Sequence, residues 1–180
     1  MKKFMFIICF LLYQFQTFGQ ASSVFFEIGG QGLGASLNYD LRLNPFNANS
    51  IGLRIGAGGF KGQDTFFSIP IGINKLIGSG QSYFDLGLGA TYLNNQGSKI
   101  NCATGYYDSK GDYICSDPII DYGIYSLPID KKSSVVGTLN FGYRKIPKYG
   151  GFTWRISLTP LFNFEKFNPF FGGFGIGYIL

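Results

Sequence analysis

Polar and apolar residues alternate along most of the chain after about residue 20. The clearest run is SYFDLGLGATYLN, in which Phe84, Leu86 and Leu88 fall on one face and Asp85 and glycines fall on the other. A period of two over about ten residues predicts a strand with one apolar and one polar face. Glycine-rich and polar clusters separate further segments of this kind. The pattern predicts eight strands, at residues 24–30, 34–43, 50–60, 65–77, 82–94, 134–146, 152–164 and 170–180.

The connections between these segments differ in length in a regular way. Short turns follow the second, fourth and sixth segments, whereas a long polar interval at 95–132 follows the fifth. Transmembrane barrels have tilted strands of about 9–11 residues, short periplasmic turns and longer outer loops. We therefore predict an all-β fold, an eight-stranded antiparallel up-and-down transmembrane β-barrel with the 95–132 loop outside the cell. Pro70 and Pro160 remove ladder donors, but the alternation continues across both, so we expect local distortions rather than strand ends.

Composition supports a membrane location for this barrel. Charged residues make up 14% of the chain, against about 25% in soluble domains, and aromatic residues make up 18%. After the first twenty residues, no stretch is apolar over the roughly 18 residues that a spanning helix needs. The net charge of +5 is small and dispersed, so we expect no nucleic-acid partner.

The N-terminus has the pattern of a signal peptide. Lys2 and Lys3 precede an apolar run over residues 4–13. Thr17 and Gly19 are small residues at the two positions that a signal peptidase inspects. We predict a signal peptide that ends at Gly19 and is cleaved after it.

The predicted barrel domain, residues 20–180, keeps two cysteines, Cys102 and Cys115, both within the 95–132 loop. An even pair in an oxidising compartment predicts a disulfide bond. The bond would close a loop of about fourteen residues, which the loop-entropy model values at roughly 3 kcal/mol.

Charged residues also occupy the polar faces of the predicted strands. We expect three acids and four bases to point into the lumen: Glu27, Asp40, Arg42, Arg54, Asp85, Arg144 and Arg155. An unpaired buried charge costs several kcal/mol, so these groups should form ion pairs. The lumen of an eight-stranded barrel is just wide enough for side chains to fill it. This favours a salt-bridged plug over a charged conduit.

The signal peptide, the eight alternating segments, the glycine-rich interior and the aromatic ending FFGGFGIGYIL resemble the small OmpA-type outer-membrane β-barrel family of Gram-negative bacteria. Gly175, Tyr178 and Leu180 match the terminal assembly signal of such proteins. The resemblance implies location in the cell outer membrane, with membrane lipid and the barrel-assembly machinery as partners, and a monomeric state.

The sequence offers no catalytic, cofactor-binding or metal-binding pattern. Outer-membrane barrels with hydrolytic or acyl-transfer chemistry generally use a histidine base, and this chain has no histidine. We expect no cofactor, no metal and a non-enzymatic structural or surface-interaction role. The 95–132 loop is rich in tyrosine, a composition suited to contacts with an extracellular ligand or protein. Two alternatives stay open, a narrow porin-like pore for small solutes and a secreted lipocalin-like barrel.

Overall fold

The computed structural model describes residues 22–61, 65–95, 99–107, 111–121 and 133–180. The predicted signal peptide lies outside these residues. Within the described part of the chain, no helix has the length and apolarity needed to cross a bilayer. The long strands are β1 (Ser22–Gly29), β2 (Ala35–Arg42), β3 (Ile51–Phe60), β4 (Phe66–Ser79), β5 (Ser82–Asn95), β8 (Ser133–Lys145), β9 (Gly151–Leu158) and β12 (Gly172–Ile179).

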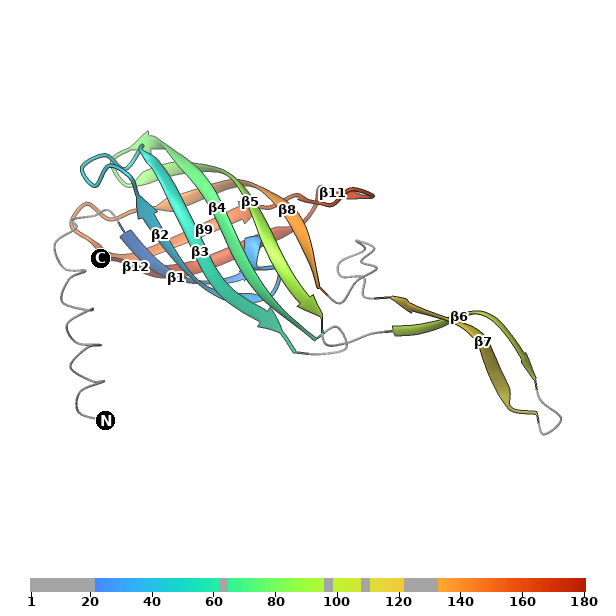
Figure 1. The fold of residues 1–180 in the computed structure, drawn as a ribbon. Helices are drawn as coiled ribbons and strands as arrows, with labels where there is room; N and C mark the ends of the chain where they lie inside the picture. The colour runs from blue at the N-terminus through green and yellow to red at the C-terminus, as the bar shows by residue number, and fades with distance from the viewer. Residues whose placement is uncertain (1–21, 62–64, 96–98, 108–110, 122–132) are drawn as a thin grey trace, which may run out of the picture.

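These eight strands form one antiparallel sheet that closes into a barrel (Figure 1). The first and last strands pair along their whole length, from Ser23 opposite Ile179 to Gly29 opposite Gly173. Strand β12 in turn pairs with β9, and β9 with β8, which completes the ring. Closure satisfies both edges of the sheet, which would otherwise be open to aggregation. The predicted eight-stranded antiparallel barrel is confirmed.

The two ends of the barrel differ. One end, called here the turn end, carries the C-terminus and the short β2–β3, β4–β5 and β8–β9 turns (Figure 1). The other end, called the loop end, carries the connection between β5 and β8. In the predicted topology the turn end faces the periplasm and the loop end faces outward.

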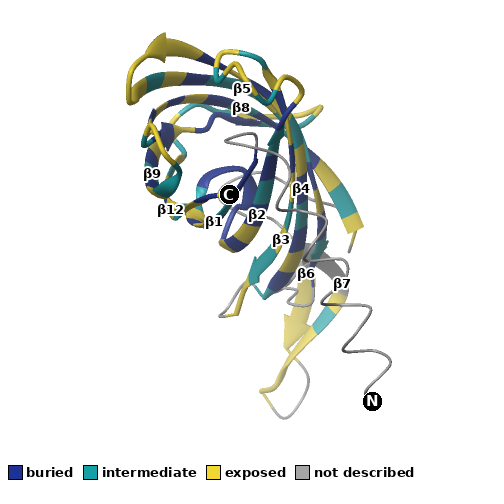
Figure 2. Cartoon of the chain, turned by 90° about the vertical axis from the view of Figure 1, so that its left-hand side faces the viewer, coloured by how far each residue is buried: buried dark blue, intermediate teal, exposed yellow. Residues whose placement is uncertain are grey.

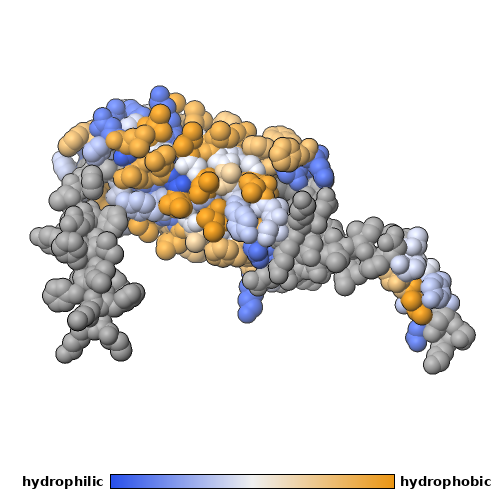
Figure 3. Space-filling view, viewed as in Figure 1, coloured by the Kyte–Doolittle hydropathy of each residue, from blue (hydrophilic) through white to orange (hydrophobic). Residues whose placement is uncertain are grey.

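The polarity of the barrel is the inverse of that of a soluble protein. Buried and exposed residues alternate along the long strands of the barrel (Figure 2), and the exposed positions hold large apolar side chains such as Ile55, Leu88 and Ile156. The buried positions hold polar residues such as Asn38 and Thr138. Apolar residues consequently cover much of the outer surface between the two ends (Figure 3).

Pro70 distorts the sheet locally without ending its strand. It lies inside β4 and faces Thr91 of β5. On the other side, the ladder to β3 has a gap at Pro70 and resumes in the same register at Ser68 opposite Gly58. The expected local distortion is confirmed here.

Pro160 has a stronger effect. The predicted strand at 152–164 is divided into β9 and a two-residue strand, β10 (Leu161–Phe162), which keeps the same register against β8. The carbonyl of Pro160 still accepts a hydrogen bond from Leu139 N at 3.0 Å. Strand β10 then pairs with β11 (Phe167–Asn168) before the chain enters β12. The expectation of a distortion without a strand end is therefore wrong at Pro160: β9 ends at Leu158, because proline cannot donate to the ladder, although the register against β8 continues in β10.

The 95–132 connection contains a second sheet, which the sequence pattern did not predict. Strands β6 (Lys99–Tyr107) and β7 (Tyr113–Asp121) form an antiparallel hairpin beyond the loop end (Figure 1). In its register Cys102 faces Pro118 and Cys115 faces Gly105. The side chain of Cys102 lies outside the described residues, so the disulfide bond stays a prediction.

Candidate functional site

The barrel interior gathers all seven of the charged residues expected there. They come from six different strands, and none is more than 6% exposed. Each projects inward because successive side chains of a strand point to opposite faces, and each of these residues occupies a position on the polar face. The structure brings them together as two groups that share one link.

Asp40 is the centre of the first group. Its Oδ1 atom accepts a hydrogen bond from Arg42 Nη2 at 2.5 Å, and its Oδ2 atom accepts one from Arg144 Nη1 at 2.9 Å. Asn74 Nδ2 donates to the same Oδ2 atom at 2.7 Å, and Asn74 Oδ1 accepts from Arg42. Arg144 also donates to Ser23 Oγ at 2.5 Å. This carboxylate is fully engaged by charged and amide donors, an arrangement that stabilises a buried charge.

The second group is more loosely paired. Asp85 Oδ2 lies 3.6 Å from Arg54 Nη2 and 3.4 Å from Arg155 Nη2. Arg155 Nε lies 3.5 Å from Glu27 Oε1. Among the described residues, the Asp85 and Glu27 carboxylates form ion pairs but no hydrogen bonds. Arg54 links the two groups because its Nη2 atom is also 3.8 Å from Asp40 Oδ2.

An aromatic ring lies in the middle of these charges. The Phe25 side chain is buried, and the guanidinium carbons of Arg54, Arg144 and Arg155 lie 5.0, 5.8 and 4.9 Å from its ring centroid. A ring face attracts cations at this distance, so Phe25 adds a partner for the excess of arginines. Sequence reasoning missed this residue, although Phe25 has the same strand parity as Glu27.

The connection between β1 and β2 folds back into the barrel. It forms a short 3-10 helix, η2 (Gly30–Gly32), whose residues are buried within the ring of strands (Figure 2). We call residues 30–33 the inner plug. The turn requires positive φ angles of 74° at Gly29 and 58° at Gly30, which glycine adopts readily. A side chain at Gly30 would overlap the Glu27 carboxylate.

Three hydrogen bonds tie the inner plug to distant strands. Gln31 Oε1 accepts from Arg54 Nη1 at 3.0 Å, and the Gln31 carbonyl accepts from Thr91 Oγ1 at 2.6 Å. The Gly32 carbonyl accepts from Ser68 Oγ at 2.7 Å. Strands β3, β4 and β5 therefore all hold the plug in place.

An apolar layer adjoins the plug. Its buried members are Leu33, Phe66, Leu93, Val136 and Leu161, and Phe171 packs against them. Phe66 begins β4 and Leu93 lies near the end of β5, so the layer lies toward the loop end of the barrel. The plug and this layer fill the lumen between the charges and the loop end.

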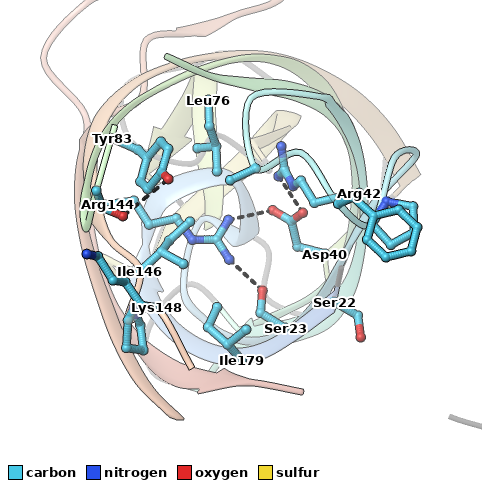
Figure 4. A pocket seen from close by; sticks show the side chains of 15 residues that line it. Ser22, Ser23, Asp40, Arg42, Leu76, Tyr83, Arg144, Ile146, Lys148 and Ile179 are labelled. Atoms are coloured by element: carbon cyan, nitrogen blue, oxygen red, sulfur yellow. Dashed lines mark hydrogen bonds and ion pairs between the residues drawn. The ribbon is translucent and has the colours of Figure 1, made fainter. Parts of the chain in front are cut away.

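The turn end is more open. A cavity of about 330 Å³ enters the barrel there and reaches Asp40, Arg42 and Arg144 (Figure 4). Figure 4 shows Arg144 extending across the cavity toward Asp40 and Ser23. Leu76, Ile146 and Ile179 pack together on its wall. The cavity ends at the Asp40 group.

The residues of the predicted assembly signal lie in or beside β12. Gly175 faces the lumen and pairs in register with Glu27 and Arg155. Tyr178 and Leu180 are exposed on the outside of the barrel. Their recognition by the assembly machinery stays a prediction.

A closed eight-stranded antiparallel barrel with an apolar exterior and a charged interior is the architecture of small outer-membrane β-barrels. Among solved structures, the N-terminal β-barrel domain of OprF from Pseudomonas aeruginosa is similar, with a TM-score of 0.52 and 11% sequence identity. The match covers 87% of this chain and 93% of that chain. Identity at this level shows a common fold. No protein-family model and no curated protein sequence matches the chain.

Proposed function

We propose that this chain is a monomeric outer-membrane protein, exported by a signal peptide at 1–19, with a structural or surface-interaction role and no enzymatic activity. The distribution of polarity supports the location. Apolar side chains such as Phe26, Ile71 and Phe174 are 44% or more exposed on the outside, where lipid would cover them. All seven charges of the interior are buried.

The main observation that supports the proposed role is that side chains fill the lumen in three consecutive regions. The ion-pair network occupies its middle, and the inner plug and the apolar layer lie beyond it toward the loop end. The three buried carboxylates are engaged by arginines, which leaves them poorly placed to act as acids or bases on a substrate. The interior thus supports a stabilising role.

The β6–β7 hairpin supports the surface-interaction part of the proposal. Tyr106, Tyr107 and Tyr113 are between 53% and 73% exposed, and the rings of Tyr107 and Tyr113 meet edge to face at 5.2 Å. Tyrosine offers a large apolar ring and a polar hydroxyl at low conformational cost, which suits contacts with an extracellular ligand or protein. Tyr122 and Tyr125 of the same loop lie outside the described residues.

Single-channel conductance in planar bilayers tests the proposal. The folded protein, checked by its heat-modifiable migration on a gel, should insert without producing steady channels. A narrow pore is the second candidate, favoured by the 330 Å³ cavity that reaches the charged network from the turn end. Detection of steady channels of uniform size would favour the pore over the structural role. The lipocalin-like alternative requires an apolar interior, whereas the described interior is mostly polar.

A further inference from the structure

The outward face of β4 carries one charged residue, Lys75. It alternates with Ile71, Ile73 and Ile77, all of which are exposed on the outside of the barrel. Among the outward-facing positions of the eight described long strands, the other charged residue is Lys145, and it is the last residue of β8. Of these two cations, Lys75 is the one that lies inside its own strand, with Ile77 beyond it on the same outward face.

The immediate neighbours of Lys75 on the barrel surface are all apolar. Ile51 of β3 and Leu86 of β5 lie directly opposite it in the two ladders. Ile73 and Ile77 precede and follow it on the same face of β4. No described residue forms an ion pair or hydrogen bond with its ammonium group. If the chain spans the outer membrane as proposed, a partner for this charge must come from the bilayer or from another molecule.

The depth of Lys75 indicates which part of the bilayer it reaches. It lies four residues before Ser79, the last residue of β4, at the turn end of the barrel. At about 3.3 Å per residue and a tilt near 40°, this places its Cα about 10 Å from the end of β4, level with the first residue of β3. A lysine at this depth extends its flexible stem along apolar surface toward the nearer interface. With the turn end in the periplasm, the ammonium group reaches the phosphate level of the periplasmic leaflet.

An apolar groove begins beside Lys75 and continues across the outer faces of neighbouring strands. Its first part has a volume of about 430 Å³ and is lined by Ile73, Leu88, Leu139 and Phe141 together with Lys75. A second part of about 830 Å³ shares Ile73 and Leu88 with the first. A cation on the wall of an apolar groove complements a molecule with an anionic head and a hydrocarbon chain.

We propose that Lys75 and this groove form a binding site for an anionic phospholipid of the periplasmic leaflet. The headgroup phosphate pairs with the Lys75 ammonium group, and an acyl chain lies in the groove over Ile73 and Leu88. The site rests on the proposed location of the barrel in the outer membrane. It does not depend on whether the lumen conducts.

Native mass spectrometry of the folded protein in detergent tests this site. Phosphatidylglycerol and phosphatidylcholine with identical acyl chains are titrated separately, and the fraction of protein with one bound lipid is measured. The attraction of a single lysine to an anionic lipid surface should give about a fivefold higher affinity for the anionic lipid than for the zwitterionic one. Lys75→Met should abolish this preference, and Lys75→Arg should keep it. Lys145→Met is the matched control and should bind like the wild type.

Three results would overturn the site. The first is equal binding of the two lipids by the wild type, and the second is a preference that survives Lys75→Met. The third is a dimer of the wild type that disappears in Lys75→Met, because a carboxylate of a second copy would then be the partner of Lys75. The measurement of lipid binding is independent of the conductance measurement that tests the proposed role. Steady channels with an intact lipid preference would refute the structural role alone.

Discussion

Replacing Asp40 with asparagine removes the centre of the charged lumen with little change in shape. The Asp40 carboxylate lies within 2.5 Å of Arg42, 2.9 Å of Arg144 and 3.8 Å of Arg54. In the wild type, three carboxylates face four guanidinium groups in the described lumen. The Asp40→Asn variant leaves two carboxylates, so Arg42 and Arg144 remain buried without the anion that they share.

The expected loss of stability is large. Removing one partner of a buried ion pair costs about 3–5 kcal/mol, because the charge that remains is uncompensated. With a urea slope of about 2 kcal/mol per molar, the midpoint of unfolding should fall by roughly 1.5–2.5 M. The fluorescence of Trp154, the one tryptophan of the chain, reports unfolding in detergent micelles because this residue is half-buried in β9.

Two further variants make the measurement specific. Glu165→Gln also removes a negative charge, but Glu165 is exposed between β10 and β11, so the free energy of unfolding should change by less than about 0.5 kcal/mol. Adding Arg144→Met to Asp40→Asn removes one of the unpaired cations and should recover part of the loss. The reasoning fails if Asp40→Asn unfolds at the wild-type midpoint, or if the double variant is no more stable than the single one.

Three other predictions address separate parts of the chain. Mass spectrometry of a non-reduced digest should recover Cys102 and Cys115 in one linked peptide pair, and free thiols at both would contradict the disulfide bond. Tyr178→Asp or deletion of residues 178–180 should abolish heat-modifiable migration of the membrane fraction. Lys148→Asp in the exposed β8–β9 turn should be tolerated. A deletion variant that still migrates as folded would mean that this terminus is neither a closing strand nor a signal. Replacing residues 30–33 with Asn-Gly, which suits a two-residue hairpin, should lower the urea midpoint of unfolding, because the hydrogen bonds from Arg54, Thr91 and Ser68 are lost. An unchanged midpoint would mean that the inner plug does not stabilise the barrel.

The barrel could be predicted because each strand has one face toward the polar interior and the other toward the apolar outer surface. This arrangement produces an alternation of polar and apolar residues with a period of two. Parity also placed Asp40, Arg54 and Arg144 inside without any knowledge of their partners. It could have placed Phe25 there too, but an aromatic residue among buried arginines contradicts the simple expectation of a polar interior.

Two features could not be predicted from local patterns. The inner plug depends on Ser68 and Thr91, which lie 36 and 60 residues from the carbonyls they bind. The sequence of residues 29–34, GGQGLG, which contains the plug, indicates only flexibility at short range. The β6–β7 hairpin lies beyond the barrel, where no apolar layer imposes strict alternation on a strand. The sequence therefore shows a polar interval there.

The bonds of Arg144 have a consequence for the rate at which the barrel opens. Arg144 lies on β8, and its partners Asp40 and Ser23 lie 104 and 121 residues earlier in the chain, on β2 and β1. Bonds between groups so distant in sequence form late, once the sheet has curved into a ring, because the intervening chain must first be ordered. Interactions absent from the folding transition state act mainly by slowing unfolding. The charged interior should therefore act mainly by slowing the unfolding of the closed barrel. Its loss should raise the unfolding rate far more than it lowers the rate of barrel closure.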